Sequence, residues 1–147
     1  METLFLTTAN PQSGRTAVVS EEADSIWLYL TAPGQQRPER DCWLLNTPDA
    51  PPRPVPHLYR ERQSPPPAPA DFTLPGAIQL VPEADRWTFI WSDDGQSVAA
   101  LLDDEPIGIA SAGRPRGLAR FIKAGAAPWA EPWDEPVWVH TFVPRPR

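Results

Sequence analysis

Alternating apolar and polar positions dominate residues 86–125, and this pattern predicts a β-meander. The three large aromatic rings in residues 87–91 alternate with other side chains, so they share one face of a strand. The apolar runs at 97–102 and 107–111 predict a second and a third strand. We therefore expect three consecutive antiparallel strands with an aromatic inner face.

Two acidic turns separate these predicted strands. The sequence reads Asp-Asp-Gly at 93–95 and Asp-Asp-Glu-Pro at 103–106. Asp and Gly tolerate the positive φ that tight hairpin turns require, so turn chemistry explains both acidic pairs without acid–base catalysis or metal binding. The carboxylates of Asp103, Asp104 and Glu105 are then expected on the surface.

Shorter apolar runs predict further strands in the N-terminal half of the chain. They fall at 3–8, 15–20, 26–31 and 41–46. The run at 26–31 is apolar on both faces, which predicts a central strand that is covered on both sides. Residues 70–82 predict one or two additional short strands.

The C-terminal third is less regular. Leu118, Phe121 and Ile122 have helical spacing, so residues 116–125 predict a short helix, with a strand as the alternative. Residues 137–143 predict the last strand.

Together these elements predict a mainly β fold. We expect antiparallel sheet arranged as a sandwich or half-barrel of about six to nine short strands, with one or two short helices. A chain of 147 residues has the size of one domain, so residues 1–147 are expected to form a single domain.

Proline interrupts the pattern between residues 48 and 70. Nine of the 21 prolines fall in this segment. Proline lacks an amide donor and breaks helices and ladders, so we expect a Pro-rich loop with local polyproline II conformation. Structureless loops of this length are uncommon in compact domains and are often functional. A surface excursion, a recognition segment and a boundary between two subdomains stay open as alternatives.

The net charge of −6 narrows the choice of partner. An acidic surface repels phosphate backbones and anionic membranes, so nucleic acid and membrane are disfavoured and a basic protein partner is favoured. One basic patch consists of Arg114, Arg116, Arg120 and Lys123. We expect it to pair internally with the acidic turns, and whether it also forms an interface stays open.

The single cysteine, Cys42, cannot form an intramolecular disulfide, which favours a reducing compartment. It lies in an apolar run, so we expect a core cysteine rather than a nucleophile paired with His57 or His140. The two histidines match no zinc motif, so neither a metal nor another cofactor is expected. The sequence shows no signal peptide and no membrane-spanning apolar run, which favours a soluble cytoplasmic protein.

Seven tryptophans suggest a binding role. Trp129 and Trp133 each follow a proline and lie outside any regular strand pattern. They either pack over an open end of the sheet or form exposed anchors at an interface.

The run at 87–102, followed by Pro106-Ile107 and Arg116-Gly117, resembles a stretch found in small bacterial domains of unknown function. The likeness covers about a quarter of the chain and carries no catalytic residue, so it implies only a class of protein. The Arg-, Ala- and Pro-rich composition is also typical of a GC-rich bacterial genome. By type, a small, acidic, cysteine-poor, all-β bacterial protein is similar to immunity proteins that neutralise secreted toxins.

We therefore expect a non-catalytic protein-binding protein, most concretely an immunity or inhibitor protein that occludes a bacterial toxin. Aromatic anchors would be buried while acidic side chains face a basic partner surface. The alternatives are a small-ligand-binding or accessory module whose inner Trp face lines a cavity, and an enzyme that uses Cys42 or a carboxylate pair. A homodimer formed through an edge strand also stays open. The candidate partner contacts are Trp129, Trp133, Asp103, Asp104 and Glu105.

Overall fold

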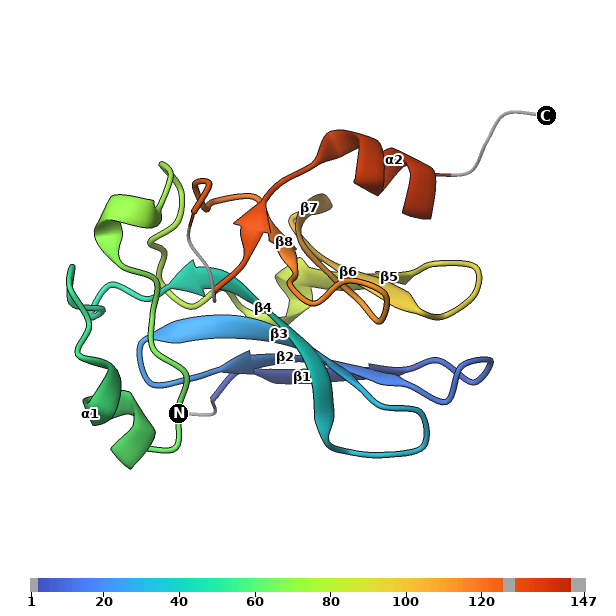
Figure 1. Cartoon of the computed structure of the whole chain (residues 1–147), viewed down its shortest axis with the longest axis horizontal. Helices are drawn as coiled ribbons and strands as arrows, with labels where there is room; N and C mark the ends of the chain where they lie inside the picture. The colour runs from blue at the N-terminus through green and yellow to red at the C-terminus, as the bar shows by residue number, and fades with distance from the viewer. Residues whose placement is uncertain (1–2, 126–128, 144–147) are drawn as a thin grey trace.

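The computed structural model describes residues 3–125 and 129–143, which form two β-sheets packed face to face as a sandwich (Figure 1). The N-terminal sheet has four strands in the order β1-β2-β3-β4, each antiparallel to its neighbour. Short connections join consecutive strands, which is the simplest antiparallel arrangement. The strands are β1 (Phe5–Ala9), β2 (Thr16–Glu21), β3 (Ser25–Thr31) and β4 (Pro38–Asn46).

The C-terminal sheet has five strands in the order β5-β6-β7-β8-β9. The first three form the predicted antiparallel meander, and the short strands β8 and β9 pair in parallel. With nine strands and two short α-helices in the described residues, the mainly β prediction is confirmed. The strands are β5 (Trp87–Trp91), β6 (Ser97–Leu102), β7 (Glu105–Ser111), β8 (Leu118–Ala119) and β9 (Glu131–Pro132).

The main core lies between the two sheets. The rings of β5 pack into it, with Trp87 buried and Phe89 and Trp91 partly buried, so the predicted aromatic face is confirmed. All of β3 is buried except Tyr29, which is half-buried, as the doubly apolar pattern predicts. The sheets approach closely at Gly108, where an added Cβ would overlap the Leu44 side chain.

A second apolar cluster covers the outer face of the C-terminal sheet. Helix α2 (Glu135–Phe142) lies on the side of this sheet that faces away from the N-terminal sheet (Figure 1). Its partly buried side chains pack on buried residues of β6, β7 and β8. The sheet residues in this cluster are Ala99, Leu101, Ile109 and Leu118.

The predicted strand at 137–143 is wrong, because this segment forms α2. Asp134 caps the helix, since its side chain accepts a hydrogen bond from Val137 N at 3.2 Å. Pro136 stands in the first turn, where its missing N–H costs nothing. The apolar residues of the segment suit a helix that lies across a sheet as well as they suit a strand.

Two further predictions are corrected. Residues 116–125 form strand β8 and an isolated bridge from Ile122 to Thr73 in place of the favoured helix, so the strand alternative is the correct one. The close approach of this segment to β4 requires glycine at position 117, because an added Cβ would overlap Cys42. Residues 70–82 form a 3-10 turn, η1 (Ala70–Phe72), and isolated bridges in place of strands, since Pro75 and Pro82 interrupt any ladder.

The Pro-rich segment is an integral part of the fold rather than a simple surface excursion. It contains a short helix, α1 (Pro56–Glu61), beside one end of the N-terminal sheet (Figure 1). Tyr59 on α1 is buried, and its hydroxyl donates to Asp24 Oδ2 at 2.6 Å. Pro67 and Ala68 are buried in the core. Neither helix that the structure describes is long and apolar enough to cross a lipid bilayer.

A buried arginine ties the opposite end of the sandwich together. Arg15 Nη1 donates to Glu39 Oε1 and to the Thr31 carbonyl, both at 3.0 Å. Arg15 Nε donates to Gln96 Oε1 at 2.9 Å, which links the N-terminal sheet to the β5–β6 turn. A buried charge is tolerated only when it is paired and hydrogen-bonded, and the bonds of Arg15 meet this condition. Because they reach both sheets, they fix the turns of the two sheets to each other.

Candidate functional site

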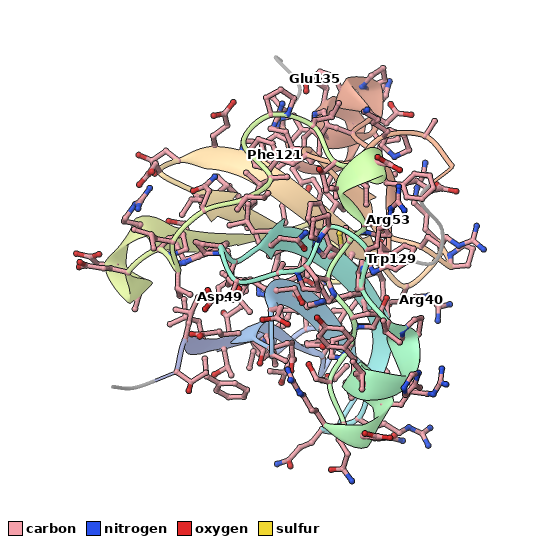
Figure 2. All side chains as sticks on the ribbon, turned by 90° about the vertical axis from the view of Figure 1, so that its left-hand side faces the viewer. Arg40, Asp49, Arg53, Phe121, Trp129 and Glu135 are labelled. Atoms are coloured by element: carbon pink, nitrogen blue, oxygen red, sulfur yellow. The ribbon has the colours of Figure 1, made fainter. Side chains whose placement is uncertain are left out.

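Trp129 has a packing role. Its ring is half-buried against the main core, and Nε1 donates to the Pro66 carbonyl at 3.0 Å. Its own carbonyl accepts from Trp43 N on β4 at 3.1 Å. Figure 2 shows Trp129 between Arg53 and Arg40, far from Glu135 on α2. The packing alternative therefore describes Trp129, while the preceding Pro128 lies outside the described residues.

Trp133 supports α2. Its Nε1 donates to Glu135 Oε2 at 2.6 Å, and its ring packs in the outer apolar cluster with Trp138 at a centroid distance of 6.1 Å. The guanidinium of Arg120 lies 4.4 Å from the Trp133 ring centroid, a cation–π distance. These contacts hold the helix on the sheet.

Asp103 and Asp104 form the β6–β7 turn, as predicted, and Glu105 is the first residue of β7. Asp103 and Asp104 have positive φ values of 51° and 66°. Two N–H groups of Arg86 bond the Asp103 carboxylate, and this hydrogen bonding lowers the pKa of Asp103. Asp104 and Glu105 are exposed. The five predicted contact residues therefore occupy three separate places in the fold.

The predicted internal pairing of the basic patch is wrong. Ion pairs in the described part of the chain join Arg15 to Glu39, Arg62 to Asp24 and Arg86 to Asp103, so no patch residue takes part. Arg120 Nε donates instead to the Pro106 carbonyl at 2.6 Å. The acidic turns bond residues other than the basic patch. Asp103 accepts from Arg86, and Asp94 accepts from the Ser92 hydroxyl and the Gln96 amide.

Cys42 is a core residue, as its apolar surroundings predict. The thiol is fully buried, lies 3.4 Å from the carbonyls of Trp43 and Leu118, and has its pKa raised by burial. His57 on α1 and His140 on α2 are both exposed. Among residues 3–125 and 129–143, no group of three or more His, Cys, Asp and Glu side chains could hold a metal ion.

The outer edge of β4 is closed by other parts of the chain. Asn46 N donates to the Ala77 carbonyl at 2.8 Å, and Gln79 N donates to the Asn46 carbonyl at 3.1 Å. The Asn46 side chain accepts from Trp43 Nε1 and Ala68 N, and it donates to the Ala68 carbonyl. Together with the Trp129 contact, these bonds close the C-terminal half of the β4 edge, from Trp43 to Asn46, while its N-terminal half, Pro38–Asp41, carries a proline and three charged residues.

The outer edge of β1 is open. Glu21 N donates to the Leu4 carbonyl at 2.9 Å and Asn10 N donates to the Arg15 carbonyl at 2.8 Å, so even-numbered residues of this strand bond β2. Along an antiparallel strand, residues whose backbone groups bond the neighbouring strand alternate with residues whose backbone groups point the other way. The backbone N–H and C=O groups of Phe5, Thr7 and Ala9 therefore point away from the sheet. Within the described residues, no hydrogen-bond partner satisfies these outward groups.

A groove of about 550 Å³ runs beside the start of β1. Its lining is mostly apolar, with the carboxylates of Glu21 and Glu83 as the charged groups, and it contains no basic side chain. We call this groove, together with Leu80, which directly precedes Val81, the β1 surface. The groove is lined by Thr3, Leu4, Phe5, Leu6, Glu21, Val81, Pro82, Glu83 and Ala84.

Large apolar side chains on the β1 surface face solvent. Leu80 is 81% exposed, Phe5 is 63% exposed and Val81 is 36% exposed. A second hollow of about 370 Å³ continues from Phe5 over Thr7 and the outer face of the N-terminal sheet. The fold gives no packing reason for these apolar side chains, and contiguous exposed apolar surface usually marks a binding site.

Acidic groups surround the apolar part of the β1 surface. The 3-10 turn η2 (Ala84–Arg86) continues directly from the groove and carries exposed Asp85. Asp103 N donates to the Arg86 carbonyl at 2.9 Å, so the acidic β6–β7 turn adjoins η2. Of the predicted acidic contacts, Asp103 thus lies beside η2. Sequence reasoning did not single out Phe5 and Leu80.

A hollow of about 540 Å³ also lies between α2 and the β5–β6 turn. Many of its polar groups bond within the protein, since Asp134 caps α2 and Ser97 Oγ donates to Ser111 Oγ at 2.8 Å. Hydrogen bonds from the Gln96 amide and the Ser92 hydroxyl lower the pKa of Asp94, which also lines this hollow. None of the three hollows is lined by the aromatic rings of β5, so the cavity that the small-ligand alternative requires is not among them.

No protein-family model, no curated protein and no solved structure matches this chain.

Proposed function

We propose that this is a non-catalytic protein-binding protein that recognises a basic partner through the β1 surface. The observation that carries the proposal is that exposed Phe5 and Val81 line one groove together with the carboxylates of Glu21 and Glu83, and that exposed Leu80 directly precedes Val81. Apolar side chains supply the free energy of association when water is excluded from them. Carboxylates at the rim set the charge of the partner and speed its approach.

The concrete form that we propose is an immunity or inhibitor protein that occludes a bacterial toxin. The net charge of −6 supports a basic partner, because opposite charges steer encounter and like charges suppress wrong partners. The single buried Cys42 supports a reducing compartment such as the bacterial cytoplasm.

Quantitative affinity capture from a lysate of the source organism tests this function. The tagged wild-type chain is compared with the double variant Phe5→Ser/Leu80→Ser. The control is Val139→Ser/Val143→Ser, which changes exposed apolar residues at the α2 end to the same degree. We expect one basic protein to be retained by the wild type and the control and to be lost with Phe5→Ser/Leu80→Ser. An identical set of captured proteins for all three chains would contradict the proposal.

The immunity form requires one further result. Expression of the captured partner alone should slow bacterial growth, and co-expression of the wild-type chain should restore it. Co-expression of Phe5→Ser/Leu80→Ser should not restore growth. A partner that is harmless on its own would leave protein binding in place but refute the immunity form.

A further inference from the structure

We propose that the partner binds by strand addition: an extended, basic segment pairs with the outer edge of β1 as a fifth strand of the N-terminal sheet. This inference rests on the proposed protein-binding function and specifies how the β1 surface acts. It names the bonding groups on this chain, which are the outward backbone groups of Phe5, Thr7 and Ala9.

The hydrogen-bond pattern of β1 leaves a repeating set of groups for a partner. The carbonyl of Leu4 and the amide of Asn10 bond β2, and the register between them is unbroken. The outward N–H and C=O groups therefore recur at every second residue in the spacing that a new antiparallel or parallel strand requires. A partner segment of about five residues would match the length of β1.

The sequence of β1 lacks the features that usually protect an edge strand. Proteins protect such strands with charged side chains, prolines, bulges or a covering loop. The strand Phe5–Ala9 contains no charge and no proline, its pairing with β2 shows no bulge, and no described segment pairs with its outer side. The other edge of the same sheet, β4, is covered in its C-terminal half by hydrogen bonds with residues 77–79 and Trp129, and its N-terminal half carries a proline and three charged residues.

The groove beside β1 can receive the side chains of an added strand. A strand that pairs with Phe5 and Thr7 places alternate side chains toward the groove of about 550 Å³ and toward the outer face of the sheet. Apolar side chains of the partner would cover Phe5, which lines both hollows. The free edge of the other sheet, β5, contributes no residue to any of the three hollows.

Charge selects a basic segment over a second copy of this chain. Glu21 and Glu83 line the groove, and Asp85 lies just beyond it. Two copies paired through β1 about a two-fold axis would run antiparallel, so these carboxylates would lie opposite the Ala9 end of the other strand, and β1 offers them no basic side chain. Arginine or lysine side chains at the ends of an added segment would instead face them.

Fluorescence polarisation with two synthetic peptides tests strand addition. The probe is the fluorescein-labelled peptide Arg-Val-Thr-Val-Arg-Val-Thr-Arg, and its control carries Glu in place of every Arg. The chains are the wild type, Thr7→Pro and Thr7→Val. Proline at this position removes an outward N–H but no ladder bond to β2, whereas valine keeps the N–H and the β-propensity.

We expect the basic peptide to bind the wild type and Thr7→Val at least tenfold more tightly than the acidic peptide does. Its affinity should fall at least tenfold for Thr7→Pro. Equal binding of the two peptides, or no binding of the basic peptide up to millimolar concentration, would overturn the inference. If the peptide test fails in this way but the captured partner is still lost with Phe5→Ser/Leu80→Ser, protein binding stands and only strand addition is refuted.

Nuclear magnetic resonance on the wild-type chain keeps the test decisive if Thr7→Pro does not fold. Addition of the basic peptide should shift the amide signals of Phe5, Thr7 and Ala9 more than those of Leu6 and Thr8. Peptide-induced shifts centred on α2 would place the binding site elsewhere and overturn the inference. A peptide-free dimer that pairs through β1 would overturn it as well, because a second copy would then be the occupant.

Discussion

The outer edges of β4 and β1, the two edge strands of the N-terminal sheet, differ in whether other segments of the chain bond to them. The edge of β4 is bonded by Trp129, Ala77 and Gln79, and the Asn46 side chain ties it to the Pro-rich segment. The edge of β1 has no such cover in the described chain, although its residues are as β-prone. The chain therefore closes one edge with the help of its Pro-rich segment and leaves the other available for a partner.

The contrast extends to side chains. On β4, the apolar residues 42–45 are buried, and Trp43 Nε1 donates to Asn46 Oδ1 at 2.8 Å. Near β1, Phe5 and Leu80 stay exposed beside the carboxylates of Glu21 and Glu83. Apolar groups at the closed edge thus stabilise the fold, whereas those at the open edge are free to stabilise a complex.

The largest expected effect is at the closed edge. Replacing Asn46→Ala leaves Trp43 Nε1 and Ala68 N buried without an acceptor. Because each unsatisfied buried donor costs about 1–3 kcal/mol, the free energy of unfolding should fall by about 2–6 kcal/mol. Urea unfolding measures this loss. The control Gln79→Ala removes only an exposed side-chain bond and should change stability by less than about 0.5 kcal/mol. A loss below about 1 kcal/mol for Asn46→Ala would show that the β4 edge is not held as described.

Trp129→Ala should have the next largest effect. The ring is half-buried against the core and its Nε1 bonds Pro66, so unfolding free energy should fall by about 2–4 kcal/mol. Trp129→Phe keeps most of the ring and should cost about 1 kcal/mol for the lost hydrogen bond. If Trp129→Ala keeps full stability but loses the captured partner, Trp129 is an interface anchor. The statement that Trp129 closes the β4 edge for the stability of the fold would then be wrong.

Alkaline pH should loosen the segment that closes β4. Burial and, to a smaller extent, the hydrogen bond to Asp24 raise the pKa of Tyr59 to about 12. Burial and, to a smaller extent, the negative charge of Glu22 also raise the pKa of Tyr29. The folded state holds these protons more tightly than the unfolded state, whose tyrosine pKa is about 10. Stability should therefore be constant up to about pH 9 and fall as pH rises from about 10 towards 12.

Tyrosinate absorbance measured together with circular dichroism tests this dependence. We expect little tyrosinate at pH 10 while the chain is folded. Tyr59→Phe should cost about 1 kcal/mol at neutral pH and flatten the alkaline fall in stability. Full ionisation of both tyrosines near pH 10 in a folded chain would refute the burial and hydrogen bonding assigned to them.

The smallest stability effects are expected at the open edge. Phe5→Thr and Thr7→Val change side chains that face solvent, so each should alter the unfolding free energy by less than about 0.5 kcal/mol. Phe5→Thr should nevertheless weaken the captured partner's binding measurably, while Thr7→Val should not. A loss of several kcal/mol for Phe5→Thr would mean that Phe5 serves the fold rather than a partner.

Local sequence patterns predicted the strands and the two acidic turns, because alternation and Asp-Gly chemistry act within a few residues. They failed at α2, where the same apolar residues fit a strand or a helix lying on a sheet. The N-cap residue Asp134 and the first-turn residue Pro136 were the signals for a helix. The packing of the Pro-rich segment depends on Asn46, which bonds Ala68 at a separation of 22 residues, and local patterns do not reveal such contacts.

The place of the candidate site was not predictable from the sequence. Net charge led to the prediction of a basic partner, which stays a prediction, and of the predicted acidic contacts Asp103 lies beside η2. The open edge itself depends on which strands end the sheet and on what covers them. Those properties follow from sheet order and from the path of residues 77–79, so Phe5 and Thr7 could not be identified before the fold was known.

Amide hydrogen exchange of the free chain tests the central claim most directly. At the open edge, the N–H groups of Phe5 and Thr7 should exchange rapidly while those of Leu6 and Thr8 are protected. At the closed edge, the N–H groups of Trp43 and Asn46 should be protected. Addition of the captured partner should then slow exchange at Phe5 and Thr7 alone among these six. Protection of Phe5 and Thr7 in the free monomer, or no change on binding, would contradict the account.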